Sequence, residues 1–232
     1  MKKSIKKPSE FPIGALVLYK NNQLIAFNKP AGLPVQGDKT GDTALSNLGE
    51  IYCKSKLFLI HRLDRPASGV TLFAKTPGAL ASLNEQFRLR QVEKVYLAAV
   101  QERPPKDEDT LVHYLKKNGR TNRTQVFDEE QAGSKKAELS YRYLGSTDYY
   151  HLLETRLHTG RHHQIRAQLA AIGCPIKGDV KYGAKRGNPG RSIHLHAWKL
   201  RFRHPVSGEW EEVVAPLPEE DPVWQAFRET LS

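Results

Sequence analysis

Short strand-like segments bounded by turn residues recur along this 232-residue chain, and they constrain its fold more than any other feature. The range 17–30 reads as two strands around a turn at Asn21 and Asn22. The range 94–100, which is continuously apolar after Lys94, indicates a buried strand. Further strands are expected around the ranges 110–116, 136–143, 150–156 and 194–203.

Three segments instead have the spacing and end signals of helices. Thr76 can cap a helix that begins at Pro77. The range 158–173 carries apolar residues at helical spacing and ends at Gly173, and Pro222 opens a last helix. Because these helices do not alternate regularly with the strands, the pattern predicts an α+β fold with a mixed, mostly antiparallel sheet and flanking helices.

Composition describes a folded chain that is long enough to bury a core. Hydrophobic residues make up 39% and charged residues 26%, so disorder is not indicated. We expect a basic, flexible N-terminal tip at 1–12 and a single domain at 13–232. The tip is basic like the start of a secretory signal, but Pro12 and Gly14 interrupt the apolar residues that follow, and no small-residue cleavage site is present. No apolar run approaches the length of a membrane span. Two cysteines, Cys53 and Cys174, without metal-type spacing favour a reducing, cytoplasmic setting.

Charge is distributed unevenly along the chain. The total is +11, from 36 Lys and Arg against 25 Asp and Glu. The range 156–203 holds eleven Lys or Arg and a single acid, Asp179, whereas the last 29 residues hold seven acids and one Arg. This asymmetry favours a polyanionic partner, most simply nucleic acid. A basic surface that is merely solvated is the alternative.

Several reaction classes lack their usual sequence marks. The chain has no P-loop, no GxGxxG and no GxSxG, which argues against nucleotide hydrolysis, dinucleotide redox chemistry and a serine hydrolase. His158 and His162 could form an i, i+4 metal pair at a helix start, but a third ligand is missing nearby. Phosphate or base contacts fit these histidines better than a metal, and no metal is expected.

One carboxylate stands among cations in HRLDRPASGVTLFAKT at 61–76. Asp64 lies beside Arg62 and Arg65, and neighbouring cations favour the ionised form of a carboxylate. It can therefore be an anion held for chemistry, or an ordinary ion pair of a loop. Together with Tyr96 and the basic range 156–203, it forms the set that chemistry on an RNA base or sugar would need.

Five ordered motifs resemble those of the RluA-type pseudouridine synthases. HRLDRPASGVTLFAKT is similar to the HRLDxxTSGxxxxAK motif of that family, and LHTGRHHQIRAQLAAIGCPIKGDVKYG to its TGRxHQIRxHxxxxGxPIxGDxxYG. NKPAGLPVQ resembles the early KPxG segment, EKVYLAAV the tyrosine-bearing strand, and HLHAWKLRFRHP the late LHAxxLxFxHP. Together the motifs span roughly residues 17 to 216.

The resemblance implies that the chain isomerises uridine in RNA. The base is cut from its ribose, turned and rejoined through carbon 5, without a cofactor, a metal or a nucleotide. The implied fold is the pseudouridine synthase fold, with a central active-site cleft. Asp64 matches the catalytic aspartate of the family, Tyr96 the tyrosine that packs against the target base, and Arg166 the basic residue that pairs with the aspartate.

Residues beside these three are expected to contact the substrate. Arg62 matches an arginine that can fill the gap left by the flipped base, or it contacts a phosphate. Ile165 is expected to line the pocket. His61 is expected to shape its loop rather than to transfer a proton. The other expected substrate contacts are Arg65, Gln164, Arg161 and His162.

Departures from the family pattern are modest. Pro66 and Ala67 replace the usual residues after Arg65, and Gln168 replaces a frequent His. The first motif begins near residue 17, which leaves no room before it for a separate RNA-binding domain. We therefore expect a monomeric, cytoplasmic enzyme that acts through one domain on ribosomal or transfer RNA. The alternatives are an RNA-binding protein of the same fold without activity and a metal-dependent nuclease.

Overall fold

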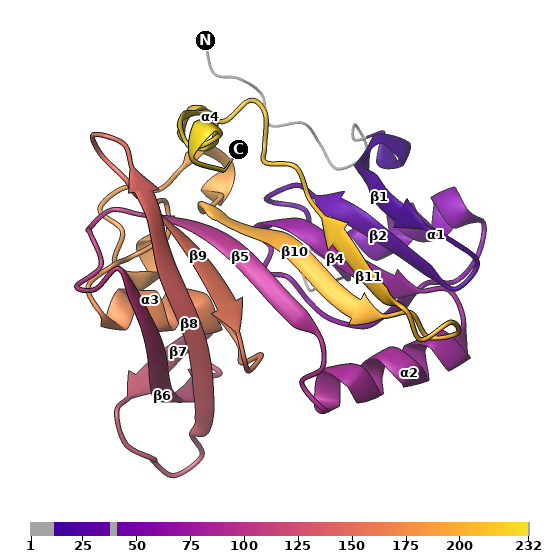
Figure 1. Ribbon diagram of the computed structural model, residues 1–232, viewed down its shortest axis with the longest axis horizontal. Helices are drawn as coiled ribbons and strands as arrows, with labels where there is room; N and C mark the ends of the chain where they lie inside the picture. Colours follow the sequence, from indigo (N-terminus) through magenta and orange to yellow (C-terminus); the bar gives the residue numbers. More distant parts are fainter. Residues whose placement is uncertain (1–11, 38–40, 232) are drawn as a thin grey trace. The chain divides into compact units, whose positions relative to one another are not determined.

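The computed structural model describes residues 12–37 and 41–231, which form two compact units (Figure 1). Unit 1 comprises the chain up to Val92 together with Ala197–Pro216. Unit 2 comprises Glu93–His196 and the residues from Leu217 onward. The basic tip expected at 1–12 lies outside the described residues except for Pro12, and the single domain expected at 13–232 stays a prediction.

The first unit is built on a sheet with the strand order β1-β2-β4-β10. β3 pairs with β4, and β11 pairs with β10, whose first two residues belong to unit 2. A turn at Asn21 joins β1 to β2, and its side-chain oxygen accepts from the backbone N–H groups of Gln23 and Leu24. The elements are the 3-10 turn Ile13–Leu16, β1 Val17–Lys20, β2 Leu24–Lys29, α1 Leu45–Cys53, β3 Phe58–Leu59, β4 Ser68–Ala74, α2 Pro77–Arg88, β10 Leu195–Arg203 and β11 Trp210–Val214.

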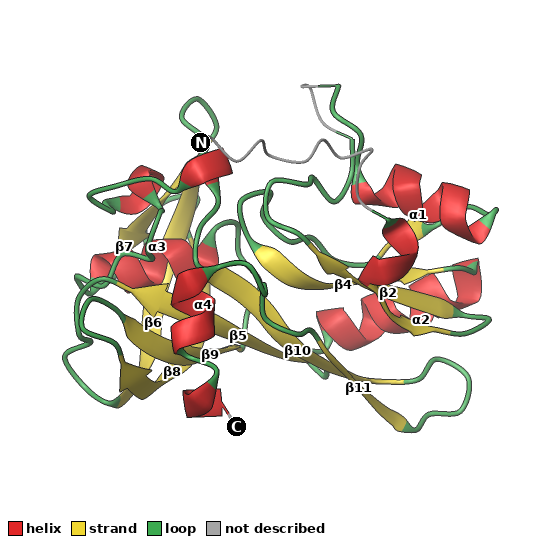
Figure 2. Cartoon of the chain, turned by 90° about the horizontal axis from the view of Figure 1, so that it is seen from above, coloured by secondary structure: helices red, strands yellow, loops and turns green. Residues whose placement is uncertain are grey.

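The two helices of unit 1 flank strands β2 and β4 (Figure 2). Leu83 of α2 belongs to the same buried apolar cluster as Leu24 and Leu72, which point to one face of the sheet. Phe27, of opposite parity in β2, lies close to Gly49 of α1. Because successive side chains of a strand alternate between faces, each helix covers a different face, and β4 is buried along its whole length.

The second unit contains a sheet with the strand order β5-β9-β8-β6-β7. All of its adjacent strands are antiparallel, and α3 packs against β6 and β7. Asp221 caps α4 by accepting from the backbone N–H groups of Val223 and Trp224. The elements are β5 Glu93–Val100, β6 Glu108–Asn118, β7 Arg123–Phe127, β8 Lys135–Ser146, β9 His151–Leu157, α3 Gln164–Ala171, α4 Pro222–Ala226 and the 3-10 turns Val180–Tyr182, Pro189–Arg191 and Glu229–Leu231.

The mixed α+β class predicted from the sequence is confirmed, and every strand pair whose register is described is antiparallel. α2 begins at Pro77, and the Thr76 hydroxyl accepts from Ala79 as predicted. Four elements, α1, β3, β7 and β11, were not predicted. The apolar pattern of α1 is short and β3 has only two residues, whereas the turn pair of Asn118 and Gly119 before β7 was an available signal. No helix in the described ranges is long and apolar enough to cross a membrane.

Candidate active site

Asp64 lies in the loop that connects β3 to β4 in unit 1. The loop ends in a turn in which the Ala67 N–H donates to the carbonyl oxygen of Asp64 at 3.1 Å. Asp64 is half-buried, and Ala67 and the first residues of β4 are fully buried. The loop therefore holds a carboxylate at the end of a rigid strand, where its position is set by the sheet.

The buried ammonium group of Lys29 binds backbone carbonyl groups of this loop and of the segment after β2. Its Nζ donates to the carbonyl oxygens of Pro30 at 3.0 Å, Leu33 at 2.9 Å, Arg65 at 3.2 Å and Ala67 at 2.6 Å. The pKa of Lys29 is lowered to about 7, chiefly by burial; the negative charge of Asp64 opposes this shift, and the positive charge of Arg65 adds to it. Sequence reasoning quoted this lysine as part of the KPxG segment but assigned it no role.

Arg65 is bound to the backbone of Gly32 through both its own backbone and its side chain. Its carbonyl oxygen accepts from the Gly32 N–H at 2.7 Å, and its Nε donates to the Gly32 carbonyl oxygen at 2.9 Å. Its Nη2 lies 2.5 Å from Asp42 Oδ2. These contacts link the KPxG segment to the loop of Asp64, and the expected contact of Arg65 with the substrate stays a prediction.

His61 and Arg62 differ in how they are placed. His61 Nε2 accepts from the Leu72 N–H at 3.1 Å, and its ring stacks on that of Phe87 with the centroids 5.4 Å apart. This packing agrees with a loop-shaping role. Arg62 is exposed and makes no ion pair or hydrogen bond with another described residue. Arg62 is the more exposed of the two residues, so its guanidinium is accessible to a substrate.

Gly69 allows β4 to approach β10 closely. Its φ is +113°, and a Cβ built there would lie 2.2 Å from the carbonyl oxygen of Ala197. Gly69 is the second residue of strand β4 and not part of a turn. The physical reason for the glycine is the close approach of two backbones, at a backbone angle that other residues rarely adopt.

Tyr96 lies on strand β5 of unit 2 and is 8% exposed. It pairs in register with Thr155 of β9, which pairs in turn with Tyr141 of β8. Residues directly opposite each other across a sheet point to the same face, so the three side chains form one row. Tyr96 is thus anchored in the core of unit 2 by a strand whose last six residues are all buried.

Arg166 is buried on α3, where Asp179 binds it through both carboxylate oxygens. Arg166 Nε donates to Asp179 Oδ2 at 2.6 Å, and Nη2 donates to Oδ1 at 2.8 Å. The side chains are 5% and 1% exposed, so the pair is shielded from water. Sequence reasoning did not identify this partner. The available signal was that Asp179 is the single acid in a strongly basic range.

Tyr182 forms a platform under the same guanidinium. Arg166 Cζ lies 5.1 Å from the centroid of the Tyr182 ring. The phenol oxygen accepts from the Thr124 N–H at 2.7 Å and lies 2.9 Å from His163 Nδ1. Burial raises the pKa of the Tyr182 phenol, so it stays neutral at physiological pH. His163 itself has a φ of +51° immediately before α3.

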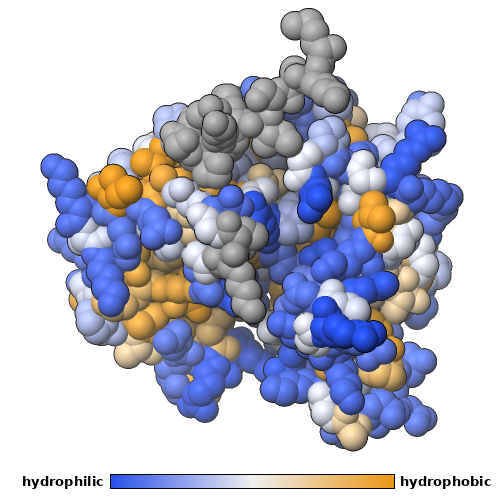
Figure 3. Space-filling view, turned by 180° about the vertical axis from the view of Figure 1, so that it is seen from behind, coloured by the Kyte–Doolittle hydropathy of each residue, from blue (hydrophilic) through white to orange (hydrophobic). Residues whose placement is uncertain are grey.

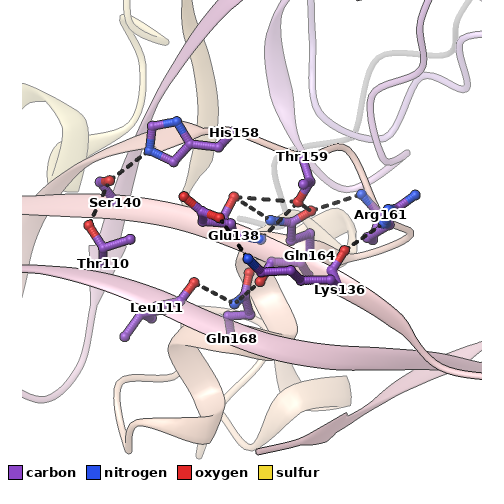
Figure 4. Close-up of polar contacts among 11 residues, drawn as sticks. Thr110, Leu111, Lys136, Glu138, Ser140, His158, Thr159, Arg161, Gln164 and Gln168 are labelled. Atoms are coloured by element: carbon purple, nitrogen blue, oxygen red, sulfur yellow. Dashed lines mark hydrogen bonds and ion pairs between the residues drawn. The ribbon is translucent and has the colours of Figure 1, made fainter. Parts of the chain in front are cut away.

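Gln164 is the first residue of α3, and its side chain makes hydrogen bonds within unit 2 (Figure 4). Its Oε1 accepts from the Thr159 hydroxyl at 2.8 Å and from the Arg161 N–H at 2.9 Å, while its Nε2 donates to the Glu138 carbonyl oxygen at 3.0 Å. Arg161 Nε donates to the Lys136 carbonyl oxygen. The side-chain amide is therefore occupied by internal hydrogen bonds, and substrate contacts from Gln164 and Arg161 remain predictions.

The i, i+4 histidine pair considered for a metal does not lie on a helix. α3 begins at Gln164, after both His158 and His162. His158 Nε2 lies 2.7 Å from the Ser140 hydroxyl, and His162 Nδ1 lies 2.9 Å from the Thr124 hydroxyl. The TGRHH segment forms a hydrogen-bonded turn that ends with His163 in the left-handed region, so helical spacing does not apply there. Ile165, the expected pocket residue, is 4% exposed.

A hollow of about 420 Å³ lies over β6, β8 and β9 of unit 2. It is lined by Glu108, Asp109, Thr110, Ser140, Tyr141, Arg142, Glu154 and Arg156. The buried carboxylate of Glu154 is paired there with Arg156 at 3.1 Å and with Arg142 at 3.5 Å. The hollow contains none of the residues predicted to act on a substrate. Figure 3, seen from behind the view of Figure 1, shows hydrophilic side chains over much of that face, with hydrophobic patches between them.

Comparisons with known proteins agree on one family. A family model described as RNA pseudouridylate synthase matches residues 23–171. An "Uncharacterized RNA pseudouridine synthase" of Chloroflexus aurantiacus is 37% identical over 200 residues, which cover 82% of this chain and 62% of that protein. "Ribosomal large subunit pseudouridine synthase C" of Pasteurella multocida is 33% identical over 225 residues, which cover 93% of this chain and 69% of that protein.

A solved structure shares the fold. The structure described as Human RNA Pseudouridylate Synthase Domain Containing 4 is 25% identical, with a TM-score of 0.73, and the match covers 89% of this chain and 90% of that chain. The present chain spans 62% of the length of the Chloroflexus relative and 69% of that of the Pasteurella relative.

Proposed function

Because the chain belongs to the RNA pseudouridylate synthase family, we propose that it isomerises uridine to pseudouridine in RNA. One observation carries the proposal: the segment that matches the family, 23–171, contains Asp64, Tyr96 and Arg166. The reaction is an intramolecular transfer, in which the bond between nitrogen 1 of the base and carbon 1′ of the ribose breaks and a bond between carbon 5 and carbon 1′ forms. Carbon 5 loses its proton, and nitrogen 1 gains one. The residues named here need no cofactor or metal for it.

Asp64 supplies the negative charge that this reaction requires. Breaking the glycosidic bond develops positive charge on the ribose, and a carboxylate beside it stabilises that charge. The carboxylate then either captures the sugar covalently or removes a neighbouring proton. Both roles need an ionised group in a fixed place, and the loop held by Lys29 supplies the fixed place.

Tyr96 and Arg166 act with Asp64 on the same nucleotide in this proposal. An aromatic ring holds a detached base by stacking without fixing its edge, so the base can turn before it rejoins. Tyr96 is also suited to assist removal of the carbon 5 proton. The guanidinium of Arg166 favours the ionised carboxylate and directs it. Arg62 replaces the extracted base in the RNA stack or contacts a phosphate.

We propose ribosomal RNA as the substrate class, with transfer RNA as the second candidate. The Pasteurella relative is named for the large ribosomal subunit, and the net charge of +11 suits a structured polyanion. The two cysteines are free thiols, in keeping with a reducing cytoplasm as the place of action. The enzyme is expected to act as a monomer.

Tritium release from RNA made with carbon-5-labelled uridine tests the proposal. The native chain should release tritium from total RNA of its host, and Asp64→Asn should release none while still binding RNA in a filter assay. Equal release from both proteins contradicts the role of Asp64. Binding without release by the native chain favours an inactive RNA-binding protein, and RNA cleavage that a chelator abolishes favours a metal-dependent nuclease.

A further inference from the structure

The guanidinium of Arg166 is held on two sides by residues of one turn that follows α3. Asp179 contacts its edge through two hydrogen bonds, and the Tyr182 ring lies under it at 5.1 Å. We call Asp179 and Tyr182 the Arg166 cradle. The turn itself is closed by hydrogen bonds from the N–H groups of Tyr182 and Ala184 to the carbonyl oxygen of Asp179. The cradle is thus a rigid element.

Because this ion pair is buried, it is suited to orienting the Arg166 guanidinium rather than to stabilising the fold. Removing two charges from water costs several kcal/mol per ion, so a buried pair often stabilises a protein no better than apolar residues of similar volume. A two-point contact between a guanidinium and a carboxylate does, however, fix the plane of the guanidinium. Asp179 takes two of the five N–H donors of Arg166 and so sets the directions of the others.

We propose that Asp179 is a positioning residue, which fixes the direction of the Arg166 guanidinium and does not itself act on the substrate. The inference rests on the proposed function, because it gives Arg166 its task there. Asp179 also balances the charge of Arg166, so the arginine can lie buried in unit 2.

Tyr182, the second residue of the cradle, is held by a hydrogen bond from the β6–β7 hairpin. The Tyr182 phenol oxygen accepts from the Thr124 N–H at 2.7 Å, and the Thr124 hydroxyl donates to the His162 carbonyl oxygen at 2.8 Å. The ring is therefore held at its far end while its face supports Arg166. Removing the hydroxyl in Tyr182→Phe should loosen the platform and leave the Asp179 contact intact.

The test compares Asp179→Asn, Asp179→Glu and Glu154→Gln in the tritium-release assay. Glu154→Gln is the matched control, because it makes the same change at another buried, paired carboxylate of unit 2. Asp179→Asn should lower kcat by about 10- to 100-fold and leave KM for RNA within about threefold of native. Asp179→Glu should restore part of kcat, and the control should match the native enzyme in both constants.

A merely structural Asp179 would give a different result. Asp179→Asn would then lower the melting temperature and the folded fraction, while kcat per folded molecule stayed native, and this outcome overturns the proposal. Should Asp179→Asn fail to fold, Tyr182→Phe decides: a fall in kcat of about three- to tenfold with native KM supports the cradle. Native kcat in Tyr182→Phe overturns it.

A readout that needs no activity separates this inference from the proposed function. The Nε–H resonance of Arg166, assigned by its loss in Arg166→Lys, should exchange slowly with solvent in the native chain and in Glu154→Gln, and rapidly in Asp179→Asn. Slow exchange in a chain that releases no tritium sinks the proposed function and leaves the cradle standing. Rapid exchange in the native chain overturns the cradle whatever the activity.

Discussion

The ammonium nitrogen of Lys29 lies 2.6 Å from the carbonyl oxygen of Ala67, three residues beyond Asp64. With its other three carbonyl partners, this contact joins the KPxG segment to the loop that carries the proposed catalytic carboxylate. A charged side chain without exposure is costly to a fold unless its donors are satisfied, and here all three N–H groups have acceptors. Lys29 thus shapes the loop of Asp64 from inside.

Lys29 should make the stability of the protein depend on pH. Its pKa is about 7 in the folded chain and 10.5 when exposed, so the unfolded chain binds more protons between these values. Its contribution to the free energy of unfolding should therefore rise with pH across that window, by up to ~1.4 kcal/mol per pH unit. Urea unfolding at pH 7, 8 and 9 should show a steeper rise for the native chain than for Lys29→Met. Parallel curves would show that Lys29 stays charged.

Gly69→Ala should destabilise unit 1 strongly. The added methyl group would meet the backbone of Ala197 at a φ of +113°, and neither strand can shift without breaking the sheet. We expect a loss of at least about 3 kcal/mol in the free energy of unfolding, measured with urea. Gly160→Ala is the control: a Cβ there meets no atom within 4 Å, so its effect should stay within about 0.5 kcal/mol.

Gln164→Leu should reduce stability more than RNA affinity. The change leaves the Arg161 N–H without its acceptor, whereas the Glu138 carbonyl oxygen keeps the N–H groups of His158 and Thr159, so the cost should be about 1–3 kcal/mol. KM for RNA should remain near native, because the amide is turned into unit 2. A large rise in KM with unchanged unfolding would instead support the substrate contact predicted from the sequence.

Arg62→Gln distinguishes the two readings of Arg62. A phosphate contact predicts weaker binding and a slope of log K against log salt that is smaller by roughly 0.7–0.9, with kcat preserved. Insertion into the base stack predicts a lower kcat with the salt slope unchanged. Arg88→Gln is the matched control, since Arg88 is exposed on α2 and paired with Glu85. It should leave binding and kcat at native values.

Local patterns in the sequence were sufficient for most of the elements and for the positions of the motifs. Thr76 and Pro77 define the start of α2, Asn21 the first hairpin, and the apolar range 94–100 lies in the buried strand β5, because capping, turn formation and side-chain alternation depend on neighbours a few residues away. The family motifs likewise located Asp64, Tyr96 and Arg166 by residue type and order. Their shared site remains a prediction.

Tertiary structure alone decided which groups surround those residues. Lys29 reaches a carbonyl 38 positions away, and Arg166 meets Asp179 across 13 positions, so no local spacing records either contact. The same holds for His162, which the sequence suggested for a helix and the fold places in a turn beside Thr124. The physical reason is burial: a polar group that is removed from water needs a hydrogen-bond partner, and the packing of distant segments determines which partner lies near it.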